Sequence, residues 1–126
     1  MKTTPLAWFL WLLLLVTGAS QLPAKPTEAD RNLLLTELRA KAEHGDATAQ
    51  FNLGICYHNG QGVTKDYVEA YKWLSLASVG GNENARGLKS ELARQMTPEQ
   101  IAKGFRSARE FKPSGAPKPG TSDPTR

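Results

Sequence analysis

Residues 52–62 read N-L-G-I-C-Y-H-N-G-Q-G, and residues 63–73 continue as V-T-K-D-Y-V-E-A-Y-K-W. This stretch predicts a helix, a glycine turn at Gly60 and Gly62, and a second helix. An αα-hairpin of this kind cannot bury its apolar faces alone. The sequence therefore predicts a short stack of helices that is built for contact rather than for chemistry.

Capping signals extend the helical pattern over residues 27–111. Thr27 and Asp66 are predicted N-caps, because their side-chain oxygens can accept hydrogen bonds from free backbone N–H groups of the first turn. The clearest start is Thr97-Pro98-Glu99-Gln100, which supplies an N-cap, a proline at the first helical position and a capping-box glutamine. We expect five helices, beginning near residues 28, 46, 66, 82 and 97, and no strand. The predicted fold class is all-α.

Apolar residues recur in these segments at the spacing of a helix. In the first segment, the pattern consists of Leu34, Leu35, Leu38 and Ala42. The segment 46–58 is expected to lie between two neighbours, because Ala49, Leu53, Cys56 and Tyr57 fall on one side and Phe51, Ile55 and His58 on the other. In the last segment, one buried stripe is expected from Ile101, Phe105 and Ala108.

A weak internal repeat supports stacking of helix pairs. Gly45 and Ala49 recur thirty-six residues later as Gly81 and Ala85. Each pair places a helix-ending glycine four residues before a small residue that lets helices approach closely. A period in the thirties is typical of solenoids built from helix pairs.

The spacing A-x-x-G-x-x-x-A-x-x-x-L-G-x-x-Y-x-x-G-x-G-V-x-x-D-x-x-x-A-x-x-W-x-x-x-A is matched by Ala42, Gly45, Ala49, Leu53, Gly54, Tyr57, Gly60, Gly62, Val63, Asp66, Ala70, Trp73 and Ala77. Ser78 stands where a second alanine is usual. With this spacing the chain resembles the Sel-one-like repeat (SLR) family, which is related to the tetratricopeptide repeats. The resemblance covers one complete repeat, about 42–77. The flanking segments 28–44 and 82–111 look like half repeats and a terminal cap.

The resemblance implies a short right-handed α-solenoid of antiparallel helix pairs that acts as an adaptor or scaffold for protein complexes. Members commonly carry several repeats, whereas this chain has a single full copy. The signature residues have structural roles: Ala49, Gly54, Ala70 and Ala77 are small where helices meet, and Leu53, Tyr57, Trp73 and Leu74 fill the space between them. Gly60 and Gly62 permit backbone angles that other residues reach only at a cost.

One stripe of the helix 46–58 is the predicted partner surface. Related solenoids line their concave groove with the first helix of each repeat, and here Thr48, Asn52, Ile55 and Asn59 fall between the two packing sides. A protein or peptide partner is expected there. A plain solvated strip is the alternative, and a binding site would then fall on the basic face around Lys103, Arg106 and Arg109.

No catalytic, metal or cofactor site is expected. Cys56 and His58 are two residues apart on one helix, so they point about 200° apart and cannot chelate one ion, with or without His44. A single cysteine in an exported chain is expected to be a free buried thiol, the alternative being a bridge to another chain. There is no Walker loop, nucleophile elbow or H-E-x-x-H motif. The remaining alternative is a small envelope enzyme, or accessory subunit, acting on cell-wall or polysaccharide material.

The two ends of the chain predict export and a soluble tail. Lys2, the apolar run 6–16 and the small residues 17–20 form a secretory signal pattern over 1–20, with cleavage after Ala19 or Ser20. The run is short of the roughly 20 residues that span a bilayer, so no stable membrane insertion is expected after cleavage, and the predicted location is periplasmic or extracellular. Residues 112–126 are rich in proline and glycine and are expected to be disordered. This leaves one domain, 27–111.

Charge is uneven along the chain. Residues 21–85 carry 6 basic and 8 acidic side chains, and residues 86–126 carry 9 basic and 4 acidic ones. The basic C-terminal third favours an acidic protein or an anionic surface as neighbour, or it is an ordinary solvated helix face with a soluble tail. Nucleic acid is not expected as a partner, because the aromatic residues fall on predicted core stripes and export would separate the protein from the genome.

Overall fold

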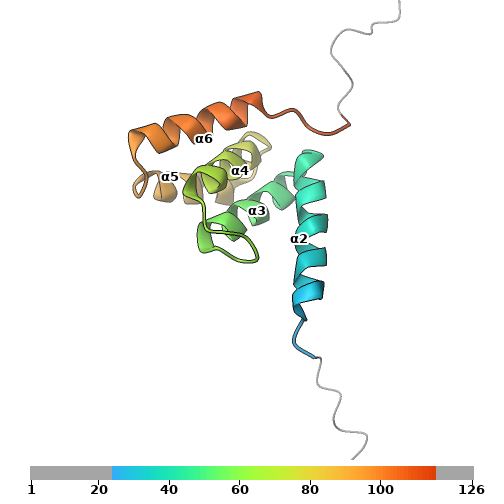
Figure 1. Ribbon diagram of the computed structural model, residues 1–126. Coiled ribbons are helices and arrows are strands. Elements are labelled where there is room, and N and C mark those ends of the chain that lie inside the picture. The colour runs from blue at the N-terminus through green and yellow to red at the C-terminus, as the bar shows by residue number, and fades with distance from the viewer. Residues whose placement is uncertain (1–23, 116–126) are drawn as a thin grey trace, which may run out of the picture.

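The computed structural model describes residues 24–115, which form five helices with no strand among them. In chain order these are α2 (Glu28–Glu43), α3 (Ala47–Asn59), α4 (Tyr67–Val79), α5 (Glu83–Ala93) and α6 (Pro98–Glu110) (Figure 1). The predicted all-α class, a short solenoid of antiparallel helix pairs, is confirmed. The predicted signal segment 1–20 lies outside the described residues, as does the part of the predicted tail from residue 116 onward.

Each helix starts at a polar N-cap whose side chain accepts a hydrogen bond from the first turn. The caps are Thr27, Asp46, Asp66, Asn82 and Thr97. Thr27 and Thr97 both form complete capping boxes, with Asp30 and Gln100 reaching back to the cap backbone. A cap of this kind contributes about 1 kcal/mol, so five of them fix where the helices begin.

Two corners of the chain have the same local structure. At the end of α2, the N–H of Asp46 donates to Lys41 O at 3.1 Å and the N–H of Gly45 donates to Ala42 O at 3.1 Å. At the end of α4, the N–H groups of Asn82 and Gly81 donate to Ala77 O and Ser78 O in the same pattern, at 2.9 and 3.1 Å. This is the Schellman arrangement, which requires a left-handed residue that glycine supplies most easily. Gly45 and Gly81 have φ of 97° and 91°.

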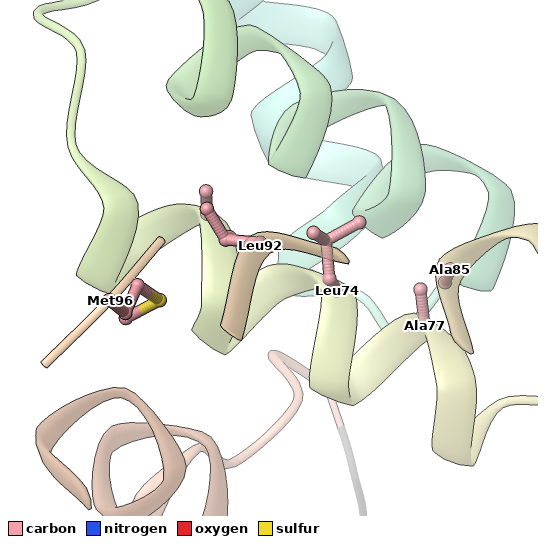
Figure 2. Packing of buried hydrophobic residues seen from close by; sticks show 6 residues of the cluster. Leu74, Ala77, Ala85, Leu92 and Met96 are labelled. Carbon is pink, nitrogen blue, oxygen red and sulfur yellow. The ribbon is translucent and has the colours of Figure 1, made fainter. Parts of the chain in front are cut away.

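Helix α4 is the centre of the fold. It packs against α3 and α5, its neighbours in sequence, and α6 crosses back over it (Figure 1). One side of α4 contributes Ala70, Leu74 and Ala77 to a core cluster with Ala85, Leu92 and Met96, and Figure 2 shows Ala77 of α4 beside Ala85 of α5. Trp73, on another side, packs with Ala42, Ala49 and Leu53 in a second cluster that joins α2 and α3 to α4.

Two glycines inside helices allow close contacts between helices. A Cβ at Gly54 would lie 2.9 Å from Leu74 Cγ, so the backbone of α3 contacts the Leu74 side chain of α4 at this point. A Cβ at Gly104 would lie 3.1 Å from Val68 O and 3.0 Å from Tyr71 Cδ1, so α6 approaches α4 just as closely. Larger residues would force each pair of helices apart.

The predicted buried stripe of the last helix is wrong at Phe105. Its side chain is 52% exposed, while Ile101 and Ala108 are half-buried and Gly104 is buried. Because α6 rests on α4 through Gly104, the contact stripe runs along Ile101, Gly104 and Ala108, at helical spacings of three and four. Phe105 follows Gly104 by 100° and therefore lies to one side of the contact with α4.

The segment after α6 returns to the α2 end of the molecule (Figure 1). The Phe111 ring meets Trp73 edge-on, with ring centroids 5.4 Å apart. The N–H of Ser114 donates to Glu43 O at 2.7 Å. Residues 111–114 therefore lie along the corner between α2 and α3 and cover Trp73.

Candidate partner-binding cleft

The surface between the first half of α2 and the end of α3 is hollowed into a cleft of about 510 Å³. It is lined by three apolar side chains of α2, by Cys56 of α3 and by the turn that follows α3. We call this the α2–α3 cleft, and its residues are Arg31, Leu34, Leu35, Leu38, Cys56, Gly60, Gln61 and Gly62.

The leucines of the cleft follow from a run of three, Leu33-Leu34-Leu35. Successive helical residues are 100° apart, so three in a row cannot all face one neighbour. Leu35 faces the rest of the fold and is half-buried, whereas Leu33 and Leu34 are 60% and 61% exposed. Of these two exposed leucines, Leu34 lines the cleft and Leu33 does not.

The glycine turn forms the opposite wall. Gly60 ends α3 with φ of 70°, and Gly62 has φ of 72°. A Cβ at Gly62 would lie 3.5 Å from Leu35 Cδ2, so the turn reaches the leucine wall of α2. Both left-handed positions favour glycine, as the sequence predicted.

Cys56 lies in the wall of the cleft. The sequence placed it on the core side of α3 as a buried thiol, but it is only half-buried. The helices α2 and α3 diverge from the corner that joins them (Figure 1). The cleft therefore lies beside Cys56, where a closely packed helix would have buried it. Partial burial raises the pKa of the thiol, so Cys56 stays protonated at neutral pH.

The predicted stripe of α3 adjoins this cleft. Thr48, Asn52 and Asn59 are exposed, and Ile55 is half-buried. Asn52 and Asn59 lie four residues before and three residues after Cys56, so they are its neighbours on the helix surface. Beside Cys56 the stripe therefore presents two amide side chains that can donate and accept hydrogen bonds.

The repeat signature lies where its structural roles require. Gly45, Gly60 and Gly62 have positive φ, and Asp66 caps α4. Tyr57 is half-buried, and its hydroxyl accepts a hydrogen bond from the Arg39 guanidinium at 2.8 Å, which ties α3 to α2. The buried members are Ala42, Ala49, Leu53, Gly54, Ala70, Trp73 and Ala77.

The two histidines and Cys56 are not brought together. His44 Nδ1 lies 2.6 Å from Ala40 O of its own helix, and His58 Nδ1 lies 2.8 Å from Asn59 Oδ1 while its ring stacks on Tyr67. Within residues 24–115, no group of three or more His, Cys, Asp or Glu side chains could hold a metal ion. In the same range, no helix has the length and apolar character needed to cross a membrane.

Sequence reasoning missed the α2 side of this surface. Arg31, Leu34 and Gln61 line the cleft but were not proposed as site residues. The signal was present in the leucine run, because one or two of three consecutive leucines must face solvent or a partner. The angle between α2 and α3, which decides which leucine is left over, depends on tertiary packing.

Paired helices joined by matching corners define a helical-repeat protein, and comparison with known proteins identifies the repeat. Residues 47–82 match the model of the family described as Sel1 repeat, which confirms the resemblance for the repeat itself. The chain is 37% identical over 62 residues to mouse DAP3-binding cell death enhancer 1, covering 49% of this chain and 12% of that protein.

A bacterial protein shows a similar relationship. Over 66 residues the chain is 39% identical to Secretory immunoglobulin A-binding protein EsiB of Escherichia coli O6:H1, covering 52% of this chain and 13% of that protein. The chain thus spans about an eighth of the length of the curated relatives it matches.

Proposed function

We propose that this chain is a non-catalytic interaction module that binds a protein or peptide segment in the α2–α3 cleft and along the adjoining stripe of α3. The observation that carries the proposal is Leu34, which lines the cleft and is nevertheless 61% exposed. The described fold leaves this apolar surface uncovered, and burying it against a partner would be favourable by about 25 cal/mol per Å².

The cleft offers a definite chemistry to such a partner. Leu34, Leu35 and Leu38 take apolar side chains, while Asn52 and Asn59 hydrogen-bond to the backbone of a bound segment. An apolar centre with a polar rim is the usual anatomy of a protein interface. The names of both relatives describe binding proteins, which supports the same class of function.

Two matched leucine substitutions test the cleft. The full chain, immobilised, captures its partner from native envelope extract after crosslinking, and mass spectrometry identifies it. Leu34→Glu places a charge in the cleft and is expected to weaken capture at least tenfold. Leu33→Glu is the control, because Leu33 has the same exposure on the same helix but does not line the cleft. Equal capture by both variants would remove the cleft as the binding site.

The stripe of α3 has its own test. Asn52→Arg combined with Ile55→Glu leaves the net charge unchanged and is expected to abolish capture of the identified partner. Ser90→Arg combined with Ala102→Glu is the matched control on exposed positions of α5 and α6. Melting temperatures and far-ultraviolet spectra of both double variants should stay near those of the parent. Undiminished capture by the folded stripe variant would limit the site to the cleft.

Export to the bacterial envelope is part of the proposal and is supported by the signal pattern over 1–20. The mass of the protein recovered from the periplasm or medium is expected to correspond to cleavage after Ala19 or Ser20. Recovery of the intact chain from the cytoplasm alone would refute export while leaving the binding proposal untouched.

A further inference from the structure

A second apolar hollow lies on a different part of the molecule, where α4, α5 and α6 meet. Its volume is about 270 Å³, enough for one large side chain. Val79 and Phe105, which are 89% and 52% exposed, both belong to it. We call it the α4–α6 hollow, and its residues are Ser75, Leu76, Val79, Lys89, Phe105, Ala108 and Arg109.

The hollow combines an apolar lining with two cations. Lys89 comes from α5 and Arg109 from α6, and within residues 24–115 neither takes part in an ion pair. The Arg109 guanidinium lies over the Phe105 ring, 5.9 Å from its centroid. Phe105 and Arg109 also line a neighbouring hollow, to which Arg106 adds a cation and Glu110 a carboxylate.

One buried hydroxyl lies beside the hollow. Ser75 is only 7% exposed and lines the hollow, yet its Oγ has no hydrogen-bond partner within the described part of the chain. A buried hydroxyl without a partner is costly, and native structures contain few of them. The Oγ atom itself is closed off from solvent, so the hollow is defined by its apolar side chains and its two cations.

We propose that the α4–α6 hollow is a second binding site, which takes an acidic peptide segment carrying one bulky apolar side chain. The apolar side chain lies against Leu76, Val79 and Phe105. Carboxylates on either side of it pair with Lys89 and Arg109. The site is separate from the α2–α3 cleft, so a chain with a single full repeat presents two contact surfaces and can join two partners.

Fluorescence anisotropy with labelled peptides tests this site on the full chain. The probe is the pentapeptide Asp-Glu-Phe-Asp-Glu between glycine spacers. Two reference peptides replace its phenylalanine by glycine or its acidic residues by lysine. The proposal expects binding of the probe that weakens as salt rises, at least tenfold weaker binding of the glycine peptide and no binding of the lysine peptide. Equal binding of probe and glycine peptide would show plain charge attraction and overturn the proposal.

Charge reversal locates the binding. Lys89→Glu combined with Arg109→Glu is expected to weaken probe binding at least tenfold. Lys25→Glu combined with Lys103→Glu changes the net charge equally at exposed positions outside the hollow and should change binding less than threefold. Phe105→Ser, at an exposed position, gives a second loss without a charge change. Equal losses in the two double variants would overturn the proposal.

Vesicles containing phosphatidylglycerol separate a peptide site from an anionic membrane site. The proposal expects the parent chain to bind the probe peptide in solution. It also expects the fraction of the parent chain that sediments with these vesicles to be no larger than that of the Lys25→Glu and Lys103→Glu control. Vesicle binding that depends on Lys89 and Arg109, in the absence of peptide binding, would assign the hollow to lipid and contradict the proposal.

Discussion

The two corners that end α2 and α4 are alike in their backbone and unlike in their surroundings. Both have a glycine at positive φ, the same pair of hydrogen bonds, and an N-cap that accepts from the N–H of a buried alanine, at 2.9 Å for Ala49 and 3.0 Å for Ala85. At Gly45 a Cβ would meet Pro113 at 3.8 Å, because the segment 111–114 lies over that corner. At Gly81 a Cβ would meet nothing within 4 Å.

This difference shows how local and tertiary contributions divide. The thirty-six-residue repeat encodes the corner, so both copies form the same turn. The covering of one copy comes from a segment outside the repeat, which places Phe111 on Trp73. Helix-pair repeats gain stability from neighbours, so a chain with one full repeat needs such a cover.

The largest effect is expected at the covered corner, from Trp73→Ala. Trp73 is 4% exposed and joins α2, α3 and α4, and truncating a buried tryptophan costs about 3 to 5 kcal/mol. For a domain of this size that is a large share of the total stability. Circular dichroism should show a largely unfolded chain at physiological temperature, with Trp73→Phe intermediate. A melting temperature within a few degrees of the parent would mean that the packing around Trp73 is wrong.

A smaller effect is expected from Phe111→Ala, because Phe111 is half-buried and makes one edge-on ring contact. The loss in unfolding free energy should be about 2 kcal/mol, measured by urea denaturation. Val79→Ala is the counterpart at the bare corner. Since Val79 is 89% exposed, its truncation should change stability by less than about 0.5 kcal/mol. Similar losses from the two variants would erase the contrast between the corners.

The smallest contrast is expected between the two N-caps. Asp46→Ala and Asn82→Ala each remove one hydrogen bond to a first-turn N–H, and each should cost about 1 kcal/mol. The two losses should agree within about 0.5 kcal/mol in the same denaturation experiment, because the caps act locally. A much larger loss at Asp46 would show that the covering segment is coupled to the turn beneath it.

Local signals explain what could be read from the sequence. Thr27, Asp66 and Thr97 were predicted as caps and are caps, and Trp73 was predicted to be buried and is. These features depend on neighbours within one helical turn or on a repeat pattern that specifies its own packing.

Tertiary geometry explains the rest. The exposure of Phe105 depends on Gly104 meeting α4, and the half-burial of Cys56 depends on the angle between α2 and α3. The hydrogen bond from Ser114 to Glu43 joins residues seventy-one positions apart, and no sequence periodicity predicts it. Three residues of the predicted stripe of α3 are exposed and Ile55 is half-buried, and the role of the stripe in binding stays a prediction.

The central claim is that the segment 111–114 closes the single repeat, and one pair of chains tests it directly. In the first, residues 111–114 are replaced by Gly-Ser-Gly-Ser, and in the second, residues 116–126 are removed. Urea denaturation should show that the first chain loses about 2 to 3 kcal/mol of unfolding free energy. It lacks the Phe111 ring contact, and its flexible backbone no longer holds the N–H of residue 114 against Glu43 O. The second chain should match the parent. Unfolding free energies that agree within about 0.5 kcal/mol for all three chains would contradict the claim.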